Sequence, residues 1–266
     1  MEARTQKQSA GSRHTAAIDD PSASQNVAEG LPAAHVWDSI YAALYAAYGP
    51  QHWWPAETRF EMIVGAYLTQ ATSWRSVERS LNNLRAAGLL SIAGIRRTPE
   101  EELRAWIRPS GFVQRKAASL HAFVRFLDRR YRGSLDQLRQ QRPAIAREQL
   151  LSLPGVGPET ADAILLYALD HPAIVVDEYL RRVSRRHGLS SGLSPGKLFD
   201  EKLRDMAARM LQQRRHGPAY KDAGEFHALI VEVGKRHCRA TAQCAGCPLE
   251  KFLPSTRNGA EVYDKF

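Results

Sequence analysis

The chain has 266 residues, with 37 Lys and Arg against 28 Asp and Glu, so it carries a formal charge of +9 and a pI near 9.7. A content of 44% hydrophobic and 24% charged residues excludes a wholly disordered chain or a collagen-like fibre. The longest apolar run, Ala163 to Leu169, is far shorter than the roughly 20 residues that cross a bilayer, and no apolar stretch near the N-terminus predicts a signal peptide. We therefore expect a cytoplasmic protein that does not enter a membrane.

The excess of basic residues favours an acidic partner, because Lys and Arg near a phosphate backbone release condensed counterions. Four arginines, Arg181, Arg182, Arg185 and Arg186, fall within one predicted helix. Charge alone does not separate a nucleic-acid interface from a solvated helix face, so both interpretations stay open at this stage.

The two ends of the chain predict loose tails. Residues 1–31 are rich in Ser, Ala, Gln, Asp and Gly and have no aromatic residue, so they bury too little to offset their ordering entropy. Residues 254–266 look similar. Between the tails the apolar residues repeat at helical spacing and no segment alternates as a strand does, which predicts an all-α fold. The predicted helices span 37–48, 60–68, 73–87, 112–131, 146–153, 160–169, 178–187, 195–213 and 220–237.

The clearest of these helices spans Phe112 to Tyr131. Its apolar residues form one stripe that should face a core: Leu120, Phe123, Val124, Leu127 and Tyr131. Just before it, the run Thr98-Pro99-Glu100-Glu101 matches a capping box and predicts a further helix that ends at Ile107.

Two further predicted helices are joined by the turn Leu-Pro-Gly-Val-Gly-Pro-Glu-Thr-Ala at 153–161. Gly155 and Gly157 lack a Cβ, so both can take left-handed angles and let a phosphate approach the backbone. We expect Thr160 to cap the second helix, whose free N–H groups would bind an anion together with the glycine amides. The alternative is a plain helix-to-helix turn, for which a single glycine is sufficient.

Three cysteines, Cys238, Cys244 and Cys247, lie close together near the C-terminus. Three clustered cysteines exclude a disulfide framework. A metal site and a set of inert thiols both remain open.

The turn resembles the helix-hairpin-helix of the DNA glycosylase superfamily that includes endonuclease III. The resemblance covers roughly Trp37 to Cys247 and implies two all-helical lobes with an active-site cleft between them. One lobe would be a six-helix barrel over 60–171 with its hairpin at about 146–169, and the other would combine 32–59 with 172–253. The implied partner is double-stranded DNA with a damaged base, bound by a monomer associated with the nucleoid.

In this family a catalytic Asp follows the hairpin, and Asp177 stands at the matching place after Ile174-Val175-Val176. Cleavage of an N-glycosidic bond builds positive charge on the sugar, which a carboxylate can stabilise while it orients water. The alternative role for Asp177 is a helix cap, and the two roles are compatible.

Bifunctional members of the family carry a Lys two residues after the second hairpin glycine, where this chain has Glu159. A carboxylate cannot form the Schiff base through which such a lysine nicks the strand. The resemblance therefore predicts a glycosylase without AP-lyase activity.

Aromatic residues occur in His52-Trp53-Trp54-Pro55 and at Trp74. With Arg108-Pro109-Ser110-Gly111-Phe112 they are similar to the endonuclease III-related 3-methyladenine DNA glycosylases, whose aromatic side chains sandwich the flipped base. Trp53, Trp54 and Trp74 would be those walls, and indole faces suit a cationic alkylated purine. Lys235 on the last long helix would approach the same pocket. The alternative is that the tryptophans are core residues and that Lys235 is solvated.

The resemblance also assigns contacts with DNA. Gly155, Val156, Gly157 and Thr160 would bind the backbone at the hairpin, and Arg181 and Arg182 would add basic contacts. Gln70 would fill the gap left by the flipped nucleotide, and Phe112 would act as the wedge beside it. These two residues would offset part of the unstacking cost.

The cysteine spacing resembles the iron–sulfur loop of endonuclease III, but the fourth cysteine is missing near Leu253. A [4Fe–4S] cluster normally needs four thiolates. Loss of the cluster and its retention with His237 as a substitute ligand both stay open.

The sequence thus predicts a monofunctional base excision repair glycosylase for alkylated purines. Two alternatives remain. One is a pyrimidine or mismatch glycosylase on the same scaffold, and the other is a hairpin module that binds DNA without catalysis.

Overall fold

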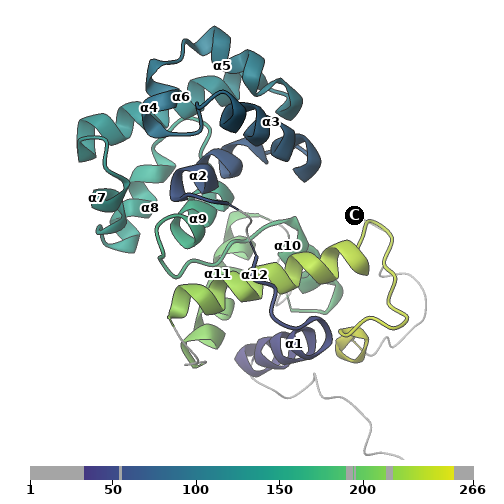
Figure 1. Cartoon of the computed structure of the whole chain (residues 1–266). Coiled ribbons are helices and arrows are strands. Elements are labelled where there is room, and N and C mark those ends of the chain that lie inside the picture. Colours follow the sequence, from purple (N-terminus) through teal and green to yellow (C-terminus); the bar gives the residue numbers. More distant parts are fainter. Residues whose placement is uncertain (1–32, 54–55, 190–193, 195, 214–217, 255–266) are drawn as a thin grey trace, which may run out of the picture.

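The computed structural model describes residues 33–53, 56–189, 194, 196–213 and 218–254. Its described part consists of helices joined by short loops, with one isolated β-bridge between Cys238 and Ala242, as Figure 1 shows. The predicted all-α fold is confirmed. Within the described residues no helix is long and apolar enough to cross a membrane.

The first hydrophobic core gathers residues from the middle of the chain, between Phe60 and Leu169. Between residues 56 and 169 this part of the chain forms eight α-helices where six were expected, because the short helices α4 and α7 add to the longer ones. The helices are α2 (Arg59–Leu68), α3 (Trp74–Ala86), α4 (Ile92–Arg97), α5 (Glu100–Trp106), α6 (Val113–Tyr131), α7 (Leu135–Arg139), α8 (Pro143–Leu151) and α9 (Pro158–Tyr167), with a 3-10 turn η2 (Arg108–Ser110) before α6. The five stripe residues predicted on α6 are all buried in this core.

The second core combines the start of the described chain with its C-terminal half. Its helices are α1 (Ala33–Tyr48), α10 (Glu178–Arg186), α11 (Lys197–Gln213), α12 (Ala219–Arg236) and the 3-10 turn η3 (Glu250–Phe252). In Figure 1, α1 lies beside the yellow-green C-terminal helices, although these helices are far from it along the chain. The boundaries predicted for the two lobes stay a prediction.

Helix α9 belongs to both cores and joins them. Leu165 packs in the first core while the next residue, Leu166, packs in the second. Asp162, 1% exposed on the same helix, accepts hydrogen bonds from Arg147 of α8 and Arg204 of α11. Contacts with both cores therefore fix the position of α9 and of the turn before it.

Two predicted caps were wrong. Thr98 ends α4 instead of starting α5, and its hydroxyl donates to the Gly94 carbonyl at 2.8 Å. Helix α9 begins at Pro158 with Gly157 as its N-cap, so Thr160 lies inside the first turn. In both places the proline, whose φ suits the start of a helix, determines where the helix begins.

Candidate active site

Asp177 lies at the N-terminus of α10, directly after a buried apolar segment. Its side chain accepts the Leu180 N–H at 2.8 Å, so the cap role that the sequence left open is present. The residue is 8% exposed, and its second carboxylate oxygen lies 3.5 Å from Nε2 of His227 on α12. The helix N-terminus and the imidazole both stabilise negative charge at this carboxylate.

His227 is held on its other side by Tyr167, the last residue of α9. Nδ1 of His227 and the Tyr167 hydroxyl lie 2.6 Å apart, and the hydroxyl also reaches the Gly224 carbonyl at 3.4 Å. Burial, with the carboxylates of Asp177 and Glu225, raises the pKa of Tyr167 well above its ordinary value, so the hydroxyl keeps its proton.

An indole closes this cluster. The Trp53 ring meets His227 edge to face at 5.1 Å and Tyr167 at 6.0 Å between centroids. Nζ of Lys235 lies 5.8 Å from the centre of the same indole ring. The structure thus brings Trp53 and Lys235, two of the predicted pocket residues, together within contact of the network around Asp177.

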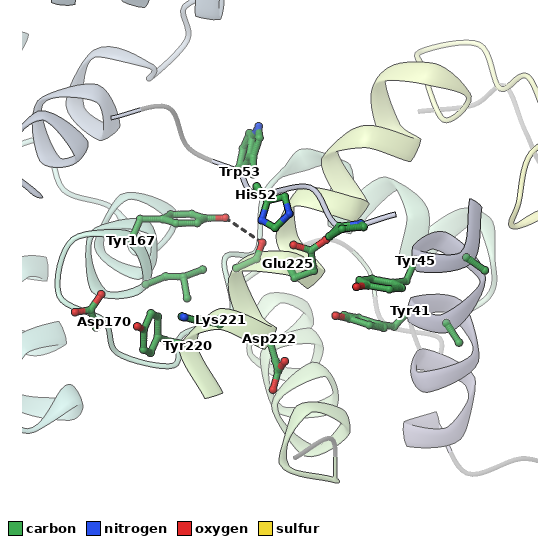
Figure 2. Close-up of a pocket in the computed structure, with 15 residues that line it drawn as sticks. Tyr41, Tyr45, His52, Trp53, Tyr167, Asp170, Tyr220, Lys221, Asp222 and Glu225 are labelled. Carbon is green, nitrogen blue, oxygen red and sulfur yellow. Dashed lines mark hydrogen bonds between the residues drawn. The ribbon is translucent and has the colours of Figure 1, made fainter. Parts of the chain in front are cut away.

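A cavity of about 850 Å³ opens beside this aromatic cluster. Figure 2 shows Trp53, His52 and Tyr167 at its edge, two tyrosines of α1 facing Glu225, and Tyr220 and Lys221 near Asp170. Aromatic rings make up much of its wall, and three carboxylates line it: Asp170, Asp222 and Glu225. An electron-rich wall with carboxylates suits a flat ligand that is electron-poor or cationic.

The other two predicted pocket tryptophans do not add to this description. Trp54 lies outside the described residues. Trp74 begins α3 and packs against the first core. The slot with three indole walls stays a prediction.

Glu159 lies in the first turn of α9, at the position where bifunctional relatives carry a lysine. Its side chain is 53% exposed, and Nη1 of Arg181 lies 3.8 Å from it. Burial of the carboxyl group and the charge of Asp177 raise the pKa of Glu159, while Arg181 and His227 act in the opposite direction. Glu159 and Asp177 are thus close enough to interact electrostatically.

The two hairpin glycines have different conformations, and only one of them uses the left-handed angles that both can take. Gly155 has φ +77°, and a Cβ there would lie 2.4 Å from the Ser119 hydroxyl. Gly157 is extended, with φ −91°, and a Cβ would meet nothing within 4 Å. Gly155 is required by the fold, whereas the space beside Gly157 is open for a ligand.

The other predicted hairpin residues also have structural partners. Val156 is buried in the first core. The side-chain amide of Gln70 donates to the Gly155 carbonyl at 2.8 Å and to the Thr160 hydroxyl at 3.0 Å. The loop after α2 and the hairpin are therefore one connected surface.

Phe112 is exposed and conformationally unusual. It is 62% exposed and has φ +48°, and it stands between η2 and α6. The buried Lys116 secures this loop, since its ammonium group donates to the Ser110 carbonyl, to the Leu68 carbonyl and to the Thr72 hydroxyl at 2.7–2.8 Å. Burial lowers the pKa of Lys116 to about 8, and Arg115 acts in the same direction. One lysine thus holds the loops of Gln70 and Phe112 together.

Arg181 and Arg182 have partners within the protein. Arg181 makes two hydrogen bonds of 2.8 Å with Asp200, and Arg182 donates to the Cys238 carbonyl at 2.7 Å. These contacts join α10 to α11 and to the cysteine loop. Contacts of Arg181 and Arg182 with DNA stay a prediction.

The three cysteines line a cavity of about 20 Å³, together with His187, His237 and Leu253. Three thiolates are one fewer than a [4Fe–4S] cluster normally needs. Leu253 stands in the cavity wall near the place where a fourth thiolate would be needed, and Nδ1 of His237 is within 3.1 Å of the Gln243 carbonyl. No group of three or more metal-binding side chains suited to an ion was found among the described residues. The loop does not fit a [4Fe–4S] cluster.

Comparison with known proteins agrees with this geometry. A model of the "HhH-GPD superfamily base excision DNA repair protein" family matches residues 64–209, which is more than half of the chain. The chain belongs to the HhH-GPD superfamily.

Individual proteins are also similar to the chain. The chain is 42% identical over 217 residues to the "Putative DNA repair glycosylase MJ1434" of Methanocaldococcus jannaschii, covering 81% of this chain and 94% of the relative. The fold resembles the 3-methyladenine DNA glycosylase MagIII of H. pylori bound to 1,N6-ethenoadenine, with a TM-score of 0.64, 27% identity, and coverage of 77% of this chain and 98% of that one. It also resembles endonuclease III in a trapped covalent DNA complex, with a TM-score of 0.68, 22% identity and coverage of 84% and 96%.

Sequence reasoning missed His227, Tyr167 and Lys116. His227 and Lys116 are polar residues on the buried faces of α12 and α6. A polar residue in an apolar helical stripe is a signal for a buried interaction, but it does not identify the partner.

Proposed function

We propose that the chain is a DNA glycosylase that removes alkylated purines of the 3-methyladenine type from duplex DNA without cutting the strand. The observation that carries this proposal is the buried carboxylate of Asp177. It stands at the N-terminus of α10, the next helix after the hairpin, and contacts His227 in an aromatic cluster at the edge of a cavity. The cap of α10 accounts for one oxygen of this carboxylate, and the position of the other oxygen beside His227 favours a catalytic role over a purely structural one.

Asp177 would stabilise the oxocarbenium ion that forms as the glycosidic bond breaks, and it would orient the attacking water. The bond to an alkylated, positively charged base is already weak. The protein therefore needs to supply little acid catalysis, and one carboxylate with a shaped pocket is sufficient.

The pocket supports a cationic or electron-poor purine as substrate. Stacking of a cationic base on Trp53 or Tyr167 gains about 0.5–2 kcal/mol of cation–π energy that a neutral base lacks. The carboxylates of Glu225 and Asp222 line the same cavity and add attraction for positive charge. The MagIII relative, described as bound to 1,N6-ethenoadenine, supports a modified purine.

The hairpin and the two loops beside it would grip the DNA. The open space next to Gly157 and the N-terminus of α9 suit a backbone phosphate. Phe112 is exposed on the loop that Lys116 secures and would insert between the stacked bases of the DNA. Gln70 would lie near the gap left by the flipped base.

Glu159 supports a monofunctional reaction, because it has no amine to form a Schiff base with the sugar. The product would be an intact strand with an abasic site.

The test is base release from three duplexes: methylated DNA, DNA with uracil and DNA with thymine glycol, each followed by chromatography of the free base. We expect 3-methyladenine or 7-methylguanine from the first and no base from the other two. Release of the pyrimidines alone would instead favour a pyrimidine glycosylase on the same scaffold.

Asp177→Asn is the matched variant for catalysis. It keeps the size of the side chain and an oxygen for the Leu180 N–H but lacks the negative charge. Base release should be abolished while binding to a duplex with a stable abasic-site analogue persists. Wild-type activity in this variant would exclude Asp177 as the catalytic group.

Borohydride trapping tests the absence of lyase chemistry. The wild-type protein should give no covalent complex with DNA that contains an abasic site, whereas Glu159→Lys introduces an amine close to Asp177 and should give one. A trapped wild-type complex would contradict the monofunctional assignment.

A further inference from the structure

His227 is buried beside the catalytic carboxylate, yet it belongs to none of the motifs that identify the family. It is 7% exposed and lies on α12, 50 residues after Asp177 and 60 after Tyr167 along the chain. Its two ring nitrogens face different partners: Nε2 faces Asp177 Oδ2 at 3.5 Å, and Nδ1 faces the Tyr167 hydroxyl at 2.6 Å.

These two contacts determine where the imidazole carries its proton. A carboxylate oxygen only accepts, so a proton on Nε2 is favourable and a lone pair there would face negative charge. Neutral His227 then leaves Nδ1 as an acceptor, and the Tyr167 hydroxyl donates to it. Because Tyr167 holds its proton firmly, this arrangement is stable at neutral pH.

The same network also accommodates a protonated imidazole. Nδ1–H would then donate to the Tyr167 oxygen, and the hydroxyl would turn to the Gly224 carbonyl, 3.4 Å away. Gly224 therefore provides Tyr167 with a second acceptor. In either protonation state Nε2 presents a proton to Asp177.

On this basis we propose that Tyr167 and His227 form a relay that positions the carboxylate of Asp177. His227 is a positioning residue, because it acts on the sugar only through Asp177. The effect of the relay on catalysis rests on the proposed glycosylase function. The position of the proton on the imidazole does not depend on that function.

The surrounding charges make such a relay useful. Burial and the charge of Asp177 raise the pKa of Glu159 on α9, so the two carboxyl groups belong to one site. The Leu180 N–H holds one oxygen of Asp177, and His227 lies beside the other. The Trp53 ring lies edge to face against the imidazole, and Nζ of Lys235 lies 5.8 Å from the centre of the indole ring.

The first experiment reads the proton directly, by NMR of the full chain labelled with ¹⁵N-histidine. Loss of one set of imidazole signals in His227→Gln identifies the residue. We expect neutral His227 in the Nε2–H tautomer in the wild type and a mixture of tautomers in Tyr167→Phe. A wild-type His227 in the Nδ1–H form would overturn the inference.

The second experiment measures single-turnover base release at saturating enzyme together with the Kd for an uncleavable duplex. His227→Leu should lower the rate about 100-fold, the loss that a misplaced catalytic group typically causes, without changing the Kd. His227→Gln places an amide N–H near the position of Nε2 and should recover most of the rate. His35→Gln, on the exposed face of α1, is the control and should match the wild type.

The outcomes separate the two proposals. If the wild type releases no base from any duplex, the proposed function fails, while the NMR experiment still decides the relay. If the wild type is active and His227→Leu has the same rate, the relay is wrong and the proposed function stands. Equal loss of rate in His227→Leu and His227→Gln, with both variants folded, would likewise overturn the relay.

Discussion

At the scale of single residues, the hairpin shows how two glycines in one motif serve different purposes. Gly155 adopts a left-handed conformation against Ser119, where any side chain would be strained and would clash. Gly157 is extended and faces open space, so the fold itself does not require it to be glycine. Its small size matters only when something else approaches the backbone.

This difference predicts opposite effects of an alanine at the two glycines. Gly157→Ala should leave the denaturant midpoint of unfolding near that of the wild type and weaken DNA binding, because the new methyl group occupies the space of a phosphate. Gly155→Ala should lower the midpoint, with a loss of about 1–3 kcal/mol typical of overpacking. If Gly157→Ala binds duplex DNA as tightly as the wild type, the phosphate does not lie there.

Leu253 allows an equally local prediction for the cysteine loop. Leu253→Cys would supply a fourth thiolate near the other three, which is the number that a [4Fe–4S] cluster needs. After anaerobic reconstitution with iron and sulfide, the variant should gain visible absorption and bound iron, and the wild type should show neither. Stoichiometric iron in the wild type would contradict the conclusion that the cysteine loop does not fit a [4Fe–4S] cluster.

At the scale of helices, one buried carboxylate joins three of them. Asp162 of α9 pairs with Arg147 of α8 and Arg204 of α11, and so connects the two cores next to the hairpin. The two arginines are 31% and 21% exposed, so part of their charge is solvated. Removing the carboxylate would leave two guanidinium groups facing each other at this junction.

Asp162→Asn should therefore lower the free energy of unfolding by about 3 kcal/mol, the low end for a broken buried pair, because the arginines retain some water. The matched control is Asp128→Asn, which removes the exposed partner of Arg96 and should cost at most about 1 kcal/mol. Chemical denaturation of both variants measures the difference. Equal losses would show that Asp162 does not hold the cores together.

At the scale of the whole molecule, buried histidines predict how stability depends on pH. Burial lowers the pKa of His121, His171 and His187, and each has one ring nitrogen that is buried without a hydrogen-bond partner. The unfolded chain binds protons at these sites near pH 6.5, where the folded protein does not, so stability rises with pH through this range and falls on acidification.

We thus expect the free energy of unfolding to decrease between pH 6.5 and about pH 5, before most carboxylates titrate. Urea unfolding at several pH values measures this slope. His187→Gln removes one of the titrating groups and should make the slope shallower. A free energy of unfolding that stays constant over this range would contradict the prediction.

The sequence alone determined the features that depend on nearby residues. Helices were predictable because apolar residues repeat at the period of the helix, and the hairpin and Asp177 were recognisable because their spacing is short and specific. The errors were also local: prolines at 99 and 158 shifted two helix starts away from the threonines expected to cap them.

Only the tertiary structure decided what lies around Asp177. Periodicity shows which face of a helix is buried, but not which side chain it meets. Tyr167, Asp177 and His227 come together because α12 packs against both α9 and α10. Lys116 joins Thr72 and Ser110, which are 38 residues apart along the chain. Contacts between distant residues depend on the packing of the whole molecule, and no short pattern in the sequence encodes them.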